Sequence, residues 1–292
     1  MEIQIEHLSK KYGNKKILDD ICLHIPTGMY GLLGENGAGR TTLMRILATT
    51  LPLTEGYVKM DGIDLQDSQR IRQIIGYLPQ EFSVYPYMSV YEVLDYLGIL
   101  AQIPRKTRKT RINSLLKMVH LEGQKHKRFK NLSGGMKRRL GIAQALLNDP
   151  RILIIDEPTA GLDPEERLHF YNLLVELAMQ RIVILSTHIA SDIEATCSDV
   201  AILCHGQIIF NGDINILIQK AAGKIYTVTI FADELDDFKK QHTIISIHQH
   251  QKAISCRFIC EKQPESHWLA CQPTLEDSYM YIMSKHKARE VE

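Results

Sequence analysis

A glycine-rich stretch, residues 34–42, has the spacing of a phosphate-binding loop. It reads Gly-Glu-Asn-Gly-Ala-Gly-Arg-Thr-Thr, follows an apolar run and precedes a helical pattern that begins near Thr41. The spacing matches G-x-x-x-x-G-K-[ST], except that Arg40 stands where lysine is expected. Such a loop points backbone N–H groups at a phosphate, and the helix N-terminus behind it favours negative charge. The stretch therefore predicts a nucleoside triphosphate site, with the Thr41 hydroxyl placed for Mg²⁺.

Two adjacent carboxylates, Asp156 and Glu157, follow the apolar run 152–155. Phosphoryl transfer to water needs a carboxylate near Mg²⁺ and a group that orients the attacking water. We expect Asp156 on the metal side and Glu157 beside the water. The alternative is that the two carboxylates merely end a strand and cap the next turn. The phosphate loop upstream makes that alternative the weaker one.

The runs that must position these groups read as buried strands separated by helices. Residues 29–33, 152–155 and 182–185 are wholly apolar, and helical patterns lie between them. Alternating strands and helices predict a mainly parallel sheet covered by helices. Residues 2–6 and 21–25 alternate apolar and polar, which predicts half-exposed strands. The region 10–16, which contains Tyr12, is expected to be the turn between them.

A helical block is predicted between the strand-rich halves, over residues 84–130. Ser89 and Glu92 have the spacing of a capping box, and a second helix is expected over about 107–120. The block contains two basic runs, 105–111 and 125–130. A solvated face is the usual meaning of such runs, and a surface that faces anionic lipid or a membrane partner is the next. Nucleic acid comes last, because no aromatic platform accompanies the charges.

The pattern changes again after residue 223. Strands are predicted at 225–231, 243–248 and 253–259, and an amphipathic helix at 275–284, which together make a small α+β appendage over 223–292. Four of its residues could be drawn as a zinc site: Cys256, Cys260, His267 and Cys271. No turn holds the first pair, so ordinary buried thiols are the expectation.

Composition narrows the class of protein. The net charge of +1 argues against a general nucleic-acid binder, and no nucleic-acid partner is expected. No run of about 18 apolar residues is present, so no transmembrane helix is predicted. The first residues alternate like a strand and do not resemble a signal peptide, so the chain is expected in the cytoplasm.

Six motifs in a fixed order resemble those of ATP-binding cassette (ABC) proteins, over about residues 1–220. After the phosphate loop come Gln80, a signature-like Leu132–Gly135, the strand end Ile155–Pro158, Gly161–Asp163 and His188. The resemblance implies an α/β P-loop NTPase with a RecA-like core, an antiparallel β segment and a helical subdomain at about 84–147. This nucleotide-binding domain would span residues 1–222.

The resemblance also implies a role for each matching residue. Tyr12 would stack on adenine, and Asp163 would lie in the loop that crosses a dimer interface. Glu157 would be the general base, assisted by Gln80 and His188, and Mg²⁺ would be held by Thr41, Gln80 and Asp156. ATP phosphates would be bound by the loop residues Gly34, Asn36, Gly37, Ala38, Gly39, Arg40, Thr41 and Thr42, and those of a nucleotide on the opposite subunit by Ser133, Gly134 and Gly135.

A transport function follows from the resemblance. It implies an ATP-hydrolysing subunit that powers separate membrane-spanning permease subunits from the cytoplasmic face of the cell membrane. It would act in a head-to-tail dimer with a second ABC subunit, either identical or different. Residues 273–279 resemble the tail of exporter-type cassettes. Soluble relatives that act on ribosomes or DNA usually carry two cassettes or a long coiled coil, and neither occurs here.

Two residues depart from the family pattern. Met136 stands where glutamine commonly follows the signature glycines, which is a mild variation. Arg40 is the larger departure, because arginine keeps the charge of lysine but is longer, planar and forked. Loss of one charge-assisted contact would cost about 1.5–3 kcal/mol. The alternative is therefore a regulatory or low-turnover cassette that binds ATP and in which Arg40 weakens hydrolysis.

Overall fold

The computed structural model describes residues 1–159, 162–250, 253–261 and 264–291, and Gly161 of the predicted motifs lies outside them. Contacts divide the chain into two compact units, Met1–Asn211 and Gly212–Glu292. This division falls ahead of the boundary predicted after residue 222, because helix α8 (Ile214–Gln219) packs against the C-terminal helix α10 (Leu275–Val291). Within the described ranges, no helix is both long and apolar enough to cross a lipid bilayer.

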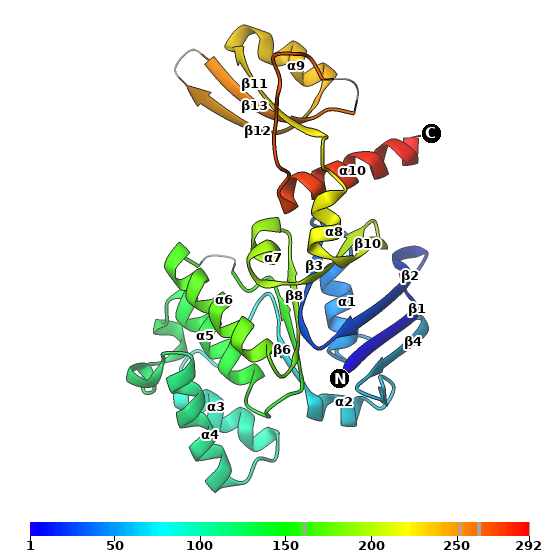
Figure 1. Ribbon diagram of the computed structural model, residues 1–292. Coiled ribbons are helices and arrows are strands. Elements are labelled where there is room, and N and C mark those ends of the chain that lie inside the picture. Colours follow the sequence, from blue (N-terminus) through cyan, green and yellow to red (C-terminus); the bar gives the residue numbers. More distant parts are fainter. Residues whose placement is uncertain (160–161, 251–252, 262–263, 292) are drawn as a thin grey trace. The chain divides into compact units, whose positions relative to one another are not determined.

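Figure 1 shows the elements of the first unit along the chain. Its strands are β1 (Glu2–Tyr12), β2 (Lys15–Pro26), β3 (Gly28–Leu33), β4 (Glu55–Met60), β5 (Ile63–Asp64), β6 (Ile75–Leu78), β7 (Ile152–Asp156), β8 (Ile182–Thr187), β9 (Asp199–Cys204) and β10 (Gln207–Asp213). Its helices are α1 (Arg40–Leu47), α2 (Ser68–Ile74), α3 (Val90–Leu100), α4 (Arg105–Met118), α5 (Gly134–Ala145), α6 (Pro164–Ala178) and α7 (Ala190–Thr196), with short 3₁₀ turns η1 (Glu122–Gln124) and η2 (Phe129–Asn131).

The central sheet has the strand order β10-β9-β3-β8-β7-β6, with parallel pairing from β9 through to β6. The prediction of a mainly parallel sheet is confirmed. Strands β7 and β8 are buried along their whole length, as their unbroken apolar runs require. Since β3, β7 and β8 are parallel neighbours, the segments that follow all three leave the sheet at the same edge.

The second sheet is antiparallel, in the order β2-β1-β4-β5. The expected turn over residues 10–16 is wrong in extent. Strand β1 continues through Tyr12, which pairs with Lys15, so the turn holds only Gly13 and Asn14. The alternation is hidden because the register shifts three times between Ile5 and Lys11, and such bulges interrupt the period of two.

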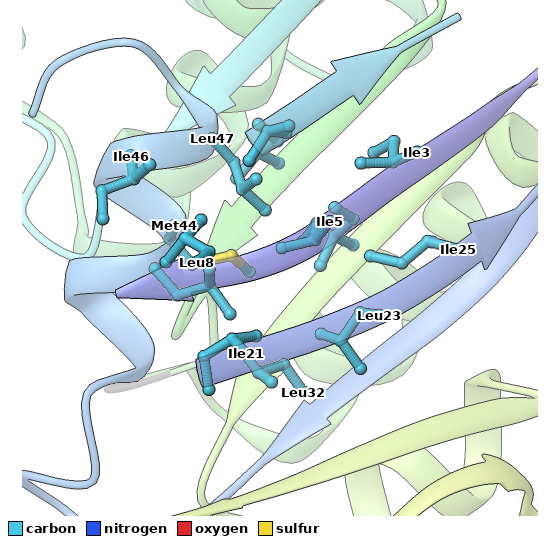
Figure 2. Close-up of a cluster of buried hydrophobic side chains, with 14 of the residues drawn as sticks. Ile3, Ile5, Leu8, Ile21, Leu23, Ile25, Leu32, Met44, Ile46 and Leu47 are labelled. Atoms are coloured by element: carbon cyan, nitrogen blue, oxygen red, sulfur yellow. The ribbon is translucent and has the colours of Figure 1, made fainter. Parts of the chain in front are cut away.

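Helix α1 lies in the main core between the two sheets. Its residues Leu43, Met44, Ile46 and Leu47 are at most 1% exposed and join a cluster with side chains of both sheets. Figure 2 shows Ile5 and Leu8 of β1 and Ile21 of β2 gathered around this helix. On the other side of the central sheet, α6 and α7 pack against β3 and β8. The helix that carries the phosphate loop is thereby held on a rigid support.

The helical block agrees with its prediction, with one correction. Ser89 and Glu92 form the predicted capping box of α3. Outside the block, Asp163 caps α6, which has Pro164 in its first turn. Helix α4 begins at Arg105, two residues before the predicted start. The run 105–111 is not wholly solvated, because Arg108 is buried and its Nε donates to Asp95 at 2.6 Å.

The second unit contains a four-stranded sheet in the order β12-β13-β11-β14. Strands β11 (Ile225–Phe231) and β13 (Ala253–Ile259) match their predictions, and β12 (Thr243–His250) is slightly longer. The prediction missed β14 (Leu269–Ala270), α8, η3 (Ala232–Glu234) and α9 (Leu235–Gln241). Cys256 and Cys260 are buried, and neither forms a disulfide within the described residues. In the described part of the chain, the one close group of three metal-capable side chains is His7, Asp20 and Cys22, not the drawn zinc set.

Candidate nucleotide site

The phosphate loop begins where β3 ends, and its glycines are required by both conformation and space. Gly37 and Gly39 have φ of +84° and +110°, a region that side chains disfavour. A Cβ on Gly34 would stand 2.4 Å from the backbone oxygen of Leu203. Gly39 is the N-cap residue of α1, so the loop delivers its backbone directly to a helix N-terminus. This is the geometry of an anion site.

Arg40 extends from the loop across the ends of β7 and β8, and its side chain is 6% exposed. Its Nη2 atom donates to Glu157 Oε1 at 2.6 Å and to Asn36 Oδ1 at 3.3 Å. Its Nη1 atom donates to Ser186 Oγ at 3.4 Å. The guanidinium therefore joins the phosphate loop to both strand ends that carry the other predicted groups.

Glu157 is the centre of this cluster. Besides Arg40, its carboxylate contacts Gln80, whose Nε2 donates to Oε2 at 3.0 Å, and His188, whose Nδ1 lies 3.0 Å from Oε1. Burial opposes the charged form, but the hydrogen bonds from Arg40 and His188 outweigh it and lower the pKa of Glu157. Its backbone lies at φ +46°, and its N–H donates to Ser186 O at 2.9 Å. The structure thus brings together all three residues predicted to be catalytic.

Asp156 is fully buried beside the same cluster. Across the residues that the structure describes, neither of its carboxylate oxygens has a hydrogen-bond partner. Burial raises the pKa of Asp156, and the nearby hydroxyls of Thr41 and Ser186 and the Arg40 charge oppose that rise. A buried carboxylate without donors is costly unless a cation reaches it. The donor set of Asp156, Thr41 and Gln80 is all oxygen-bearing and fits Mg²⁺.

The remaining predicted residues lie in four places. Tyr12 is exposed at the end of β1, with Lys10 Nζ 5.2 Å from its ring centroid. Ser133 is the N-cap of α5 and accepts from the N–H of Met136 at 3.2 Å, so Ser133–Gly135 form a second helix start. Asp163 accepts from the N–H of Glu166 at 2.8 Å. Ala38 and Thr42 belong to the loop and to α1.

Sequence reasoning missed several buried polar residues around the site. Asp192 on α7 is 1% exposed, forms an ion pair with Arg167 and accepts from the hydroxyls of Thr159 and Thr187 at 3.1 and 3.4 Å. This network ties the loop after β7 to the loop after β8. Ser186, the residue that contacts Arg40, directly follows the apolar run 182–185. A carboxylate four residues after His188 was the available signal for Asp192.

Known proteins with similar sequences and structures identify the family of this chain. The sequence model of the ABC transporter family matches residues 18–160. An ABC transporter ATP-binding protein of Bacillus subtilis is 35% identical over 245 residues, which cover 84% of this chain and 81% of the relative. The chain belongs to the ABC transporter family. It is an ATP-binding and ATP-hydrolysing subunit that powers transport.

Two further relatives agree with this assignment. A Nod factor export ATP-binding protein of Cupriavidus pinatubonensis is 33% identical over 240 residues, covering 81% of this cassette and 74% of the relative. A bacterial ABC transporter cassette solved as a dimer has a TM-score of 0.66 and 26% identity, covering 72% of this chain and 98% of its own. The same cassette has also been solved in a post-hydrolysis state with ADP and phosphate.

Proposed function

We propose that the cluster around Glu157 is the hydrolytic centre of this cassette. The observation that carries the proposal is the convergence of Gln80 and His188 on one ionised, buried carboxylate, next to a phosphate loop. With ATP in the loop, Glu157 would accept the proton of the attacking water, Gln80 would orient that water, and His188 would contact the γ-phosphate. Tyr12 would stack on the adenine.

Asp156, Thr41 and Gln80 would hold Mg²⁺ beside the β- and γ-phosphates. The ion supplies positive charge that neutralises the phosphate oxygens. Among the described residues, no group is in hydrogen-bond geometry with the Asp156 oxygens, which supports this assignment. The role of the chain's own residues is to keep the ion's ligands fixed on β7 and α1, two elements of the main core.

The signature segment Ser133–Gly135 would complete the site of a second cassette. A helix start with a serine hydroxyl and glycine N–H groups is a second anion site. Within the described residues, Ser133–Gly135 form none of the side-chain hydrogen bonds of the Glu157 carboxylate. In a head-to-tail dimer, this segment would lie on the partner's ATP, and Asp163 would lie near the interface. The dimeric cassette to which this chain is similar supports the arrangement.

The membrane-spanning subunits would dock beside α3. A groove of about 410 Å³ lies there between the segment after Gln80 and the helix, and its lining is largely apolar and aromatic: Val84, Tyr85, Pro86, Met88, Tyr96 and Leu97. The Tyr85 side chain in this lining is exposed. The groove is linked along the chain to Gln80, so docking and hydrolysis would be coupled. The cassette would lie on the cytoplasmic face, and the similarity to an export protein supports outward transport.

Phosphate release from the purified full chain tests the hydrolytic centre. We expect Mg²⁺-dependent release from ATP that falls at least about 100-fold in Glu157→Gln, because the proton acceptor is lost. The matched control is Glu165→Gln, whose side chain is 87% exposed on α6. Equal rates for the two variants would refute the role of Glu157.

A second candidate function is a low-turnover or regulatory cassette. The contact between Arg40 and Glu157 favours it. Arginine stands in place of lysine, and its guanidinium binds the carboxylate that is proposed to accept the proton of the attacking water. Arg40→Lys is then expected to raise the hydrolysis rate by roughly 10-fold or more, the value of one charge-assisted contact. A variant rate no higher than that of the unaltered chain would remove this candidate.

A further inference from the structure

The guanidinium of Arg40 lies between two competing anion sites. On one side is the phosphate loop, from which Asn36 accepts a hydrogen bond from Nη2. On the other side is Glu157, which accepts from the same nitrogen at 2.6 Å. Ser186 holds the other arm of the fork through Nη1. A lysine has one nitrogen and could not reach from the loop to both strand ends in this way.

The contact between Arg40 and Glu157 is a buried ion pair in which each side chain compensates the charge of the other. Their side chains are 6% and 10% exposed, so each would be a poorly solvated charge without the other. The opposing groups around Glu157 are the Nε2 donor of Gln80 and the ring of His188, and neither replaces the full charge of Arg40. The pair is therefore expected to persist until a stronger anion reaches the loop.

We propose that Arg40 is a positioning residue that exchanges Glu157 for nucleotide phosphate. In the nucleotide-free cassette it holds the base in a buried ion pair. When a diphosphate or triphosphate enters the loop, the guanidinium turns to the phosphate oxygens, and Glu157 is released for the attacking water. This inference rests on the proposed function, and it adds that the base is available only in a loaded site.

The exchange has a thermodynamic consequence. Nucleotide must compete with Glu157 for Arg40, so the carboxylate lowers nucleotide affinity by the strength of the pair. Neutralising Glu157 should then tighten nucleotide binding, provided that Arg40 is present to be released. A pair that stays closed at all times predicts no such dependence on residue 40. The two arrangements are separated by a double-mutant cycle.

The experiment measures binding of a fluorescent ADP analogue to the full chain and to Glu157→Gln, Arg40→Gln and the double variant. ADP excludes contributions from hydrolysis and from an ATP-bridged dimer. We expect Glu157→Gln to tighten ADP binding about 10-fold when Arg40 is present and less than 2-fold when it is replaced. If Arg40→Gln is not folded by circular dichroism, Arg40→Met takes its place in the cycle.

Equal effects of Glu157→Gln in both backgrounds would overturn the exchange, because they would report only repulsion between carboxylate and phosphate. Absence of ADP binding by all four chains would instead overturn the nucleotide site itself, and the exchange with it. Thermal unfolding gives a second readout. The coupling between the two positions should be present without ADP and absent at saturating ADP, and coupling that persists with ADP would show a permanent pair.

Discussion

Glu166 lies directly against Gly135, and a Cβ on that glycine would stand 1.9 Å from Oε2. The carboxylate is held there by Arg139, at 2.9 Å from Oε1. Gly135, the second residue of α5, is thus required by its own chain, in addition to any role at a partner's nucleotide. A flexible side chain rather than backbone causes the conflict, so the conflict can be relieved.

Gly135→Ala is expected to destabilise the protein by roughly 1 kcal/mol, because Glu166 must leave Arg139. The double variant Gly135→Ala with Glu166→Ala should cost no more than Glu166→Ala alone. Urea unfolding measures both. Gly123→Ala is the control, since no atom of the described residues lies within 4 Å of its added Cβ. A full additional cost in the double variant would contradict the proposed conflict.

Gly34→Ala is expected to be more damaging than Gly135→Ala. Its Cβ would stand 2.4 Å from the backbone oxygen of Leu203, which belongs to β9 of the central sheet and cannot turn away. We expect a loss of about 2 kcal/mol or more without nucleotide, since overpacking then shifts backbone. Thermal unfolding of the nucleotide-free chain measures it. A midpoint unchanged from that of the unaltered chain would contradict the prediction.

Asp156→Asn is expected to stabilise the nucleotide-free cassette by about 1–3 kcal/mol at neutral pH. It removes a buried charge that accepts no well-formed hydrogen bond from the described residues and has only the Thr41 and Ser186 hydroxyls nearby. The pKa of Asp156 is raised in the folded state, so its charge destabilises the fold above that value. The destabilisation by the charged Asp156 should therefore decrease as the pH falls through the raised pKa. The stability advantage of Asp156→Asn should decrease with it. Melting temperatures from pH 7 downward test this, and an advantage that is constant with pH would argue against it.

Asp277→Asn is expected to destabilise the second unit by about 3 kcal/mol. The Asp277 carboxylate accepts from Nη2 and Nε of Arg257 at 2.6 and 2.8 Å, and from the N–H of Thr274, the residue before α10, at 2.7 Å. Burial opposes its charge, but these bonds outweigh burial and lower its pKa.

The stabilisation by Asp277 is therefore complete above the ordinary carboxyl pKa and is lost as the pH falls below about 4, through the lowered folded value. Unfolding followed by circular dichroism across this range should show this loss of stability in the unaltered chain. Asp277→Asn should not show it. Exposed Glu276, changed to Gln, is the control. An equal effect of both changes would contradict the assignment.

The elements of the site could be predicted from sequence because their signals are local. Unbroken apolar runs mark β3, β7 and β8, and the capping residue Asp163 marks α6. The first hairpin was predicted less well, since bulges in β1 disturb the alternation on which the prediction depends. The buried Arg108 looked like part of a solvated basic run, because burial depends on a partner, Asp95, that lies 13 residues away.

The sequence by itself determined that a phosphate loop, two carboxylates, a glutamine and a histidine occur in the order of an ABC cassette. Their spacing sets local backbone geometry, and local geometry is enough to place an anion at a helix start. Only the tertiary structure decided that Arg40 binds Glu157, 117 residues further along the chain. That contact exists because β3, β8 and β7 are parallel neighbours, with Leu33 beside Thr187 and Asp156 beside Ser186. The order of the strands in the sheet cannot be predicted from Arg40 or Glu157 alone.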